Sequence, residues 1–262
     1  MNRLDKLLAF LDACRASRSL NLRGLPVWPK RLFPFLPYHR TSYNAFLCWI
    51  RKLQLPGSTW IVDAGANHGD FSEAASASFP GTNVLLFEPF PQLFPELERR
   101  CRRHHPRWIL ETCALGDRED TQNLYISPAH DAVGSLKGFP DSYRRTSATT
   151  DDITSIPCRV RPLDGILAER GIGRIDLLKI DVEGAEFEVL RGAENTLGNT
   201  LSVIIEVSTI RDMDQGRTAL LRLLALLEEH RFRTVAVLPS LYSRKDPWLP
   251  ADFNVLARKD PG

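Results

Sequence analysis

The segment IDLLKIDVEGAEFEVLRGAE, residues 175–194, combines an apolar run with a concentration of ionisable side chains. A lysine, Lys179, stands inside the apolar run, and the run ends in acids that begin with Asp181 and Glu183. A buried ammonium needs an anionic partner, and Asp181, two residues later on the same side of the strand, is the nearest candidate. A lysine and carboxylates at the end of a strand can take a proton from a reacting group, so this segment is a candidate catalytic site.

Two more acids lie on a helix that we expect over residues 185–197. Glu186 falls on the apolar stripe of this helix, so we expect it to point inward from the first turn. Glu188 lies off the stripe and should pair with solvent or with Arg191. Glu183, in the turn before the helix, can favour the positive helix end. Alternatively, Glu183 and Glu186 only cap the helix and bond the loop backbone.

A further acid, Glu206, ends the next apolar segment, LSVIIEVS. If the two strands are neighbours in a sheet, Glu206 lies beside Asp181. Asp181, together with Glu183 or Glu206, can then act as the base that removes a proton, and Lys179 is another candidate base. Alternatively, Asp181 and Glu206 can hold Mg²⁺, which takes oxygen ligands and lowers the pKa of a hydroxyl group bound to it.

A second candidate site is the turn in WIVDAGANHGDFS, where Gly65 and Gly69 flank Asn67 between an expected strand and an expected helix. Glycines let the backbone bend tightly and approach a ligand, and the helix N-terminus offers unpaired N–H groups. Asn67 departs from the G-x-G-x-x-G pattern of dinucleotide binders. Asp63, at the end of the strand, favours a cationic or zwitterionic ligand over a pyrophosphate.

Glu88 ends the next strand, in VLLFEPFP, 25 residues after Asp63. An acid in this place can hold both hydroxyls of a ribose, and NAD and S-adenosylmethionine both carry one. Phe90 either covers an adenine face or belongs to the core. The backbone from Ala114 to Asp117, at the end of the third expected strand, should lie near the adenine edge.

The elements that must position these side chains alternate between strand and helix. We expect strands at TWIVDAG, TNVLLFE, WILETCAL, IDLLKID, LSVIIEVS, RTVAVL and FNVLA, and helices over FSEAASASF and residues 91–103, 185–197 and 215–230. Such alternation predicts an α/β fold with a parallel sheet covered on both faces. Ligands of these sheets bind beyond the carboxyl ends of the strands, where the acids and glycines above are placed.

One long polar segment, residues 127–156, interrupts the alternation. Loops of this length in compact domains are usually functional or disordered. We expect either a lid or substrate-recognition loop or plain disorder. His130 and Asp131, within this segment, are a third candidate for the base.

The motifs VDAGANHGDFS, FEPFP, ALGD and DLLKIDVEGAEFEVLRGA, in this order and at these spacings, resemble the FkbM-type S-adenosylmethionine-dependent methyltransferases over about residues 58–207. The resemblance implies the class I methyltransferase fold, a Rossmann-like, doubly wound sheet of seven mostly parallel strands with the last strand antiparallel. It implies acceptors that are hydroxyls of sugars, glycans or small natural products, with His68 near the cofactor rather than acting as a base. The residues that it implies as cofactor contacts are Asp63, Gly65, Asn67, Gly69 and Glu88, to which we add Phe90 and Ala114.

Residues 1–57 are expected to form a basic, helical N-terminal arm, with a helix over residues 42–55, and residues 58–262 the methyltransferase domain. The first sixty residues hold ten Lys or Arg against two acids, and the remainder holds 24 against 30. The arm either binds an anionic surface, such as lipid headgroups, or packs on the body. The basic run ERRCRRHHPR lacks the interleaved aromatic residues that stack on bases, which disfavours a nucleic acid substrate.

The sequence has no apolar run of about 20 residues, as a membrane span requires, and no apolar secretory signal near Met1. Its five cysteines include no C-x-x-C pair, so we expect a cytoplasmic protein, peripheral at the membrane if the arm binds lipid. The prediction is a methyltransferase that acts on a hydroxyl oxygen. A nicotinamide-dependent oxidoreductase and a non-catalytic scaffold that uses the basic arm are the alternatives.

Overall fold

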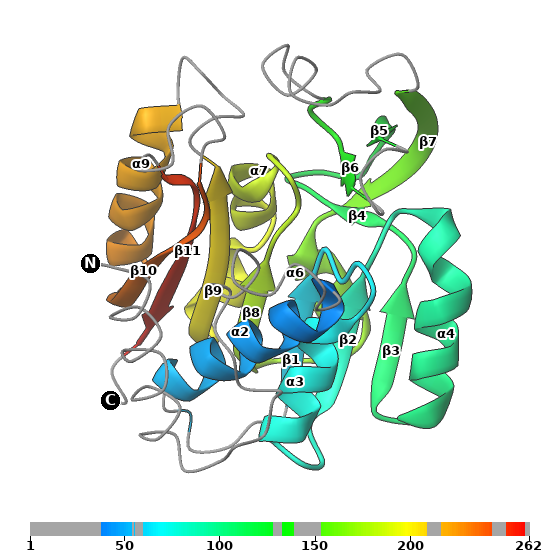
Figure 1. Ribbon diagram of the computed structural model, residues 1–262, viewed down its shortest axis with the longest axis horizontal. Helices are drawn as coiled ribbons and strands as arrows, with labels where there is room; N and C mark the ends of the chain where they lie inside the picture. Colours follow the sequence, from blue (N-terminus) through cyan, green and yellow to red (C-terminus); the bar gives the residue numbers. More distant parts are fainter. Residues whose placement is uncertain are drawn as a thin grey trace, which may run out of the picture.

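The computed structural model describes residues 38–53, 55, 60–127, 133–138, 153–208, 216–242 and 250–259. Its main feature is a seven-stranded sheet in the order β10-β11-β9-β8-β1-β2-β3 (Figure 1). The neighbours from β9 to β3 are parallel, whereas β11 is antiparallel to both β9 and β10. The predicted mostly parallel, Rossmann-like sheet with an antiparallel last strand is therefore confirmed. The strands are β1 (Trp60–Ala64), β2 (Asn83–Phe87), β3 (Trp108–Glu111), β8 (Ile175–Ile180), β9 (Thr200–Ser208), β10 (Arg233–Tyr242) and β11 (Pro250–Arg258).

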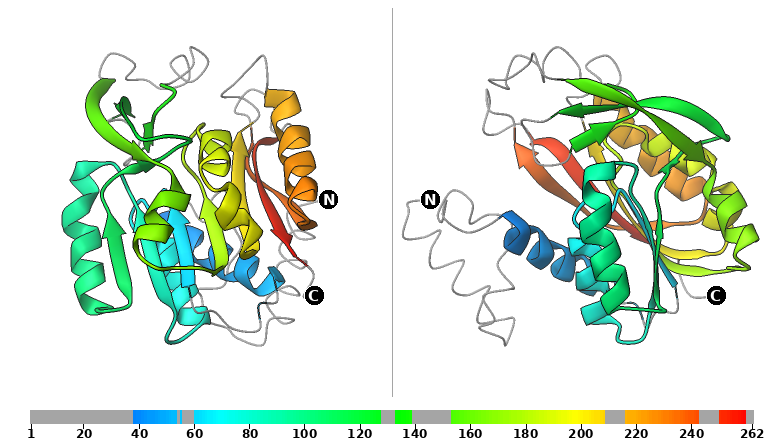
Figure 2. Two further views of the ribbon diagram at one scale, coloured as in Figure 1. Left: turned by 180° about the vertical axis from the view of Figure 1, so that it is seen from behind. Right: turned by 90° about the vertical axis from the view of Figure 1, so that its right-hand side faces the viewer.

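Helices cover both faces of this sheet, which is why its strands are apolar on both sides (Figures 1 and 2). The helices α2, α3 and α4 pack on one face, and α6, α7, α8 and α9 pack on the other. Every residue of β8 is buried, including Lys179. The helices are α2 (Tyr38–Leu53), α3 (Asp70–Ser78), α4 (Phe94–Arg103, after the 3₁₀ turn Pro91–Leu93), α6 (Leu163–Glu169), α7 (Glu186–Arg191), α8 (Glu194–Gly198) and α9 (Gly216–Glu229).

Two predicted elements are each divided in the structure. The helix expected over residues 185–197 is two short helices, α7 and α8, because the chain turns at Gly192. A Cβ atom on Gly192 would lie 1.9 Å from the carbonyl oxygen of Gly116, so the backbone is pressed against another segment at this point. The expected strand WILETCAL is likewise two strands, β3 in the main sheet and β4 (Ala114–Leu115) in a second sheet.

The second sheet, in the order β4-β7-β5-β6, was not predicted. Its other strands are β5 (Asp120–Ser127), β6 (Val133–Ser135) and β7 (Thr154–Arg161). Figure 1 shows it above the end of the main sheet from which α7 begins. The described parts of the expected loop over residues 127–156 thus include strand β6 and the start of β7. His130 and Asp131 lie outside the described residues, so the lid and the third base stay predictions.

Helix α2 lies within the predicted arm and packs on the body. Ile50 and Leu53 are buried against α3 and the sheet, and the ring of Phe46 meets that of Phe71 edge-on, with centroids 5.4 Å apart. This part of the arm therefore follows the packing alternative, and its helix begins four residues before the expected residue 42. Residues 1–37 lie outside the described residues, so their affinity for an anionic surface and the boundary at residue 57 stay predictions. Among the described helices, none combines the length and apolar character of a membrane span.

Candidate active site

The glycine turn between β1 and α3 is held against the ends of the neighbouring strands. Gly65, Asn67 and Gly69 have φ angles of 77°, 51° and 83°, a left-handed conformation that favours glycine and asparagine. A Cβ atom on Gly65 would lie 1.9 Å from the carbonyl oxygen of Asp181, so only glycine fits there. The amides of Gly65 and Ala66 both donate to the carbonyl oxygen of Phe87, at 3.0 and 2.9 Å in the order named. The predicted tight turn is therefore present, and its contact with a cofactor stays a prediction.

Glu88 follows β2 and borders this turn. Its carboxylate accepts hydrogen bonds from the amide of Asn67 at 2.7 Å and from the amide of Phe90 at 2.9 Å. Burial raises the pKa of Glu88 to about 7, although both amides act to lower it. Each carboxylate oxygen keeps a further lone pair, so the side chain suits the bidentate recognition of two hydroxyls.

Lys179 lies at the centre of an ionic cluster under the turn. Its ammonium is 3.2 Å from Asp63 and 3.5 Å from Asp181, and it donates to the carbonyl oxygen of Gly65 at 2.6 Å. Burial alone would lower the pKa of Lys179, but the charges of Asp63 and Asp181 raise it. A base needs the neutral amine, so these surroundings oppose Lys179 as the base and favour a fixed cation.

The structure changes how three predicted cofactor residues can act. The side chain of Asp63 has no exposed surface, and it accepts a hydrogen bond from the hydroxyl of Ser72 at 2.7 Å. Asp63 therefore anchors Lys179 and α3 from beneath the turn. Phe90 and Ala114 are buried in one core cluster, as the core alternative for Phe90 expected. Glu88 and the backbone at Gly65, Asn67 and Gly69 remain the candidates for contact with a cofactor.

Three carboxylates meet at the carboxyl ends of β8 and β9. Asp181, Glu183 and Glu206 each offer one oxygen atom, and these atoms lie within 4.8 Å of one another. The predicted proximity of Asp181 and Glu206 is confirmed, because β8 and β9 are parallel neighbours. The hydroxyl of Ser135 in β6 donates to the carbonyl oxygen of Glu183 at 2.7 Å, so the second sheet fixes this turn.

The two acids of α7 point as predicted. Glu186 is buried at the first turn and accepts the amide hydrogen of Gly184 at 2.9 Å. Glu188 pairs with Arg191 at 3.1 Å and also with Lys137, at 2.8 Å, from the turn after β6. The pairing with Arg191 was predicted, whereas the pairing with Lys137 depends on the second sheet and left no signal in the sequence.

We expect Glu186→Gln to change how stability depends on pH. Burial raises the pKa of Glu186 from 4.5 to about 7, so between these values the folded protein holds a proton that the unfolded chain has lost. Stability therefore falls as the pH rises through this window, by up to about 3 kcal/mol from this one group. Urea unfolding measures the free energy of unfolding at about pH 5 and at about pH 8. The decrease in this free energy between the two pH values should be smaller for the variant than for the natural protein.

Glu188→Gln is the matched control on the same helix. Burial of part of the side chain would raise the pKa of Glu188, but the hydrogen bond from Lys137 and the charges of Lys137 and Arg191 lower it. Its contribution to stability is therefore lost as the pH falls, which is the opposite sign. An unchanged pH dependence in Glu186→Gln would show that the buried carboxyl is not protonated in this window.

The fold and the site together define the class of protein. The sheet is that of the class I methyltransferase fold. A glycine turn follows β1, an acid follows β2, and carboxylates gather at the carboxyl ends of β8 and β9. Residues 63–234 match the family model described as the methyltransferase FkbM domain, so the chain belongs to this family of methyltransferases.

Individual relatives agree with this assignment. The chain is 31% identical to the 31-O-demethyl-FK506 methyltransferase FkbM of Streptomyces tacrolimicus, over 75% of this chain and 81% of the relative. It is 28% identical to the 2-O-methyltransferase NoeI of Sinorhizobium fredii, over 68% of this chain and 74% of the relative. A solved structure from Klebsiella pneumoniae, proposed to be an O-methyltransferase, has 12% identity and a TM-score of 0.50 over 97% of each chain, which shows the fold.

Proposed function

We propose that this methyltransferase moves a methyl group from S-adenosylmethionine to a hydroxyl oxygen of a sugar, a glycan or a small natural product. The observation that carries the proposal is the contact between the glycine turn and the acidic end of β8. Gly65 lies against the backbone of Asp181, and Lys179 contacts both residues. A cofactor on the turn and an acceptor beside the carboxylates would therefore be neighbours.

The residues around the turn fit the proposed cofactor. Bound there, S-adenosylmethionine would supply an electrophilic methyl group on a sulfonium ion. Glu88 would hold the ribose hydroxyls, because its carboxylate is fixed by two amides and retains free lone pairs. The backbone at Gly65, Asn67 and Gly69 would allow the close approach that their positive φ angles create.

The carboxylates would handle the acceptor. A hydroxyl oxygen attacks well only as it loses its proton, and a nearby carboxylate can take that proton. Asp181, assisted by Glu183 or Glu206, would orient the hydroxyl group and accept its proton. Lys179, whose ammonium is 3.5 Å from the carboxylate of Asp181, would hold this carboxylate in place. The names of the two relatives, 31-O-demethyl-FK506 methyltransferase and 2-O-methyltransferase, support oxygen as the methylated atom.

The alternative for the same carboxylates is a Mg²⁺ ion held by Asp181 and Glu206. Their oxygen atoms suit this ion, but the ammonium of Lys179 already supplies a positive charge beside Asp181. A second cation there would be repelled. We therefore propose a carboxylate base, and we expect turnover to survive treatment with EDTA; loss of turnover that Mg²⁺ restores would assign the metal role instead.

Calorimetric titration with S-adenosylhomocysteine tests the cofactor directly. We expect micromolar binding that Glu88→Ala weakens by about a hundredfold, because two charge-assisted hydrogen bonds of about 1.5 kcal/mol each depend on this carboxylate. Glu119→Gln, which changes an exposed acid in the turn between β4 and β5, is the control and should bind normally. NAD⁺ should give no heat; binding of NAD⁺ alone would favour the oxidoreductase, and binding of neither ligand the non-catalytic scaffold.

A further inference from the structure

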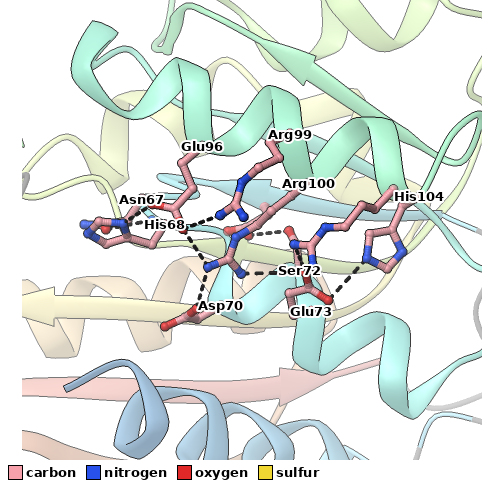
Figure 3. Close-up of polar contacts among 11 residues, drawn as sticks. Asn67, His68, Asp70, Ser72, Glu73, Glu96, Arg99, Arg100 and His104 are labelled. Carbon is pink, nitrogen blue, oxygen red and sulfur yellow. Dashed lines mark hydrogen bonds and ion pairs between the residues drawn. The ribbon is translucent and has the colours of Figure 1, made fainter. Parts of the chain in front are cut away.

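The outer side of the glycine turn is joined to α4 through a chain of polar contacts (Figure 3). Glu96, in the first turn of α4, accepts a hydrogen bond from Nδ1 of His68 at 2.8 Å and another from Arg100 at 2.9 Å. Partial burial alone would raise the pKa of Glu96, but these two hydrogen bonds lower it. Glu96 is therefore an anion with each carboxylate oxygen held by a different partner.

Arg100 extends these contacts to α3, the helix that follows the turn. Its guanidinium is 3.3 Å from Asp70 and 3.7 Å from Glu73, and its side chain is 14% exposed. Arg100 thus bridges carboxylates from two helices. Its guanidinium is largely buried, and solvent screens ion pairs less there than on the surface. This fixes the position of Glu96 relative to the start of α3.

His68 carries the contact into the turn itself. Its amide donates to the side-chain oxygen of Asn67 at 2.7 Å, while the amide of Asn67 donates to Glu88 on the opposite side. The turn also lies close to α4, because a Cβ atom on Gly69 would be 3.1 Å from Leu97. The left-handed conformation of Asn67 is therefore held from the sheet side by Glu88 and from the helix side through His68.

We propose that Glu96 is a positioning residue that acts through His68 to hold Asn67 and the rest of the glycine turn in the conformation that binds the cofactor. Arg100 orients Glu96 and so belongs to the same device. The inference rests on the proposed function, because the turn must be the cofactor site. The inference gives a role to Arg100 of the basic run ERRCRRHHPR. The other basic residues of the run are explained by the preference for positive charge at the C-terminal end of a helix.

The test compares Glu96→Gln with Glu98→Gln, a substitution of an exposed acid on the same helix that lies 3.7 Å from Arg102. We expect Glu96→Gln to weaken S-adenosylhomocysteine binding about tenfold and to raise the KM for S-adenosylmethionine similarly, since a hydrogen bond to a charged group contributes about 1.5 kcal/mol. The kcat at saturating cofactor should stay within about twofold, and Glu98→Gln should change neither constant by more than that. A merely structural role would instead lower kcat through loss of folded enzyme.

A double-mutant cycle with His68→Ala tests the route of the effect. If Glu96 acts through His68, adding Glu96→Gln to His68→Ala should weaken binding by less than about twofold. Additive losses, or an unchanged affinity in Glu96→Gln, would overturn the positioning role while leaving the cofactor assignment intact. If the natural protein itself does not bind S-adenosylhomocysteine, the proposed function fails and this inference fails with it.

Discussion

Asp181→Asn should lower the turnover number by at least about a hundredfold, because general base catalysis contributes about 10²- to 10⁴-fold. Asparagine keeps the shape of the side chain but cannot take up a proton at neutral pH. The cofactor turn should be little affected, because it touches Asp181 through the backbone carbonyl and Lys179 retains Asp63 as an ionic partner. Binding of S-adenosylhomocysteine should therefore stay within about threefold of the natural value.

Release of S-adenosylhomocysteine with a panel of sugars and small hydroxylated natural products provides the measurement, on the acceptor that the natural protein methylates best. Glu188→Gln is the matched control, since Glu188 is a nearby acid whose partners are Lys137 and Arg191. Its turnover should be close to natural. Full turnover in Asp181→Asn would remove Asp181 from the role of base and direct attention to Glu183 and Glu206, which share its cluster.

The parts of the site that follow from strand ends could be predicted from the sequence. Lys179 and Asp181 alternate with apolar residues in one segment, so their proximity follows from the period of a strand, and they lie 3.5 Å apart. Glu206 ends the next strand, and parallel neighbours bring their carboxyl ends to one edge. These inferences need only the alternation of side chains along a strand and the rule that ligands bind beyond the carboxyl ends of parallel strands.

The second partner of Lys179 could not be predicted, because it depends on the register between strands. In the sheet, Asp63 of β1 stands opposite Lys179 of β8, and no local pattern sets that register. An acid in one apolar strand and a lysine in another are a signal of such a pair, because a buried charge needs a partner. Asp63 was instead expected to face a ligand. Its side chain is completely buried, and its carboxylate contacts Lys179 and Ser72.

The features that could not be predicted from the sequence are those that depend on contacts between segments far apart in the chain. Gly192 ends α7 because its backbone meets the carbonyl of Gly116, 76 residues away in the chain by residue number. The second sheet likewise pairs β5 with β7 across the long polar segment. The second sheet also contributes to the site, because the hydroxyl of Ser135 in β6 donates a hydrogen bond to the carbonyl oxygen of Glu183.

Gly65→Ala should both destabilise the fold and abolish binding of S-adenosylhomocysteine. The added Cβ atom would lie 1.9 Å from the carbonyl oxygen and 2.9 Å from the carbonyl carbon of Asp181, and these are backbone atoms that cannot rotate away. Alanine would also have to hold a φ of 77°, which costs about 1–2 kcal/mol. The turn and the end of β8 must therefore separate, with an expected loss of about 3–5 kcal/mol in the free energy of unfolding.

Gly81→Ala separates the clash from the backbone conformation. Gly81 has a φ of 92°, but a Cβ atom there would meet nothing within 4 Å. Its substitution should lower the free energy of unfolding by only about 1–2 kcal/mol and leave S-adenosylhomocysteine binding unchanged. Urea unfolding and calorimetric titration of both variants give the comparison. Equal stability losses with binding retained in Gly65→Ala would mean that the turn and β8 are not in contact, and the proposed adjacency of cofactor and acceptor would lose its basis.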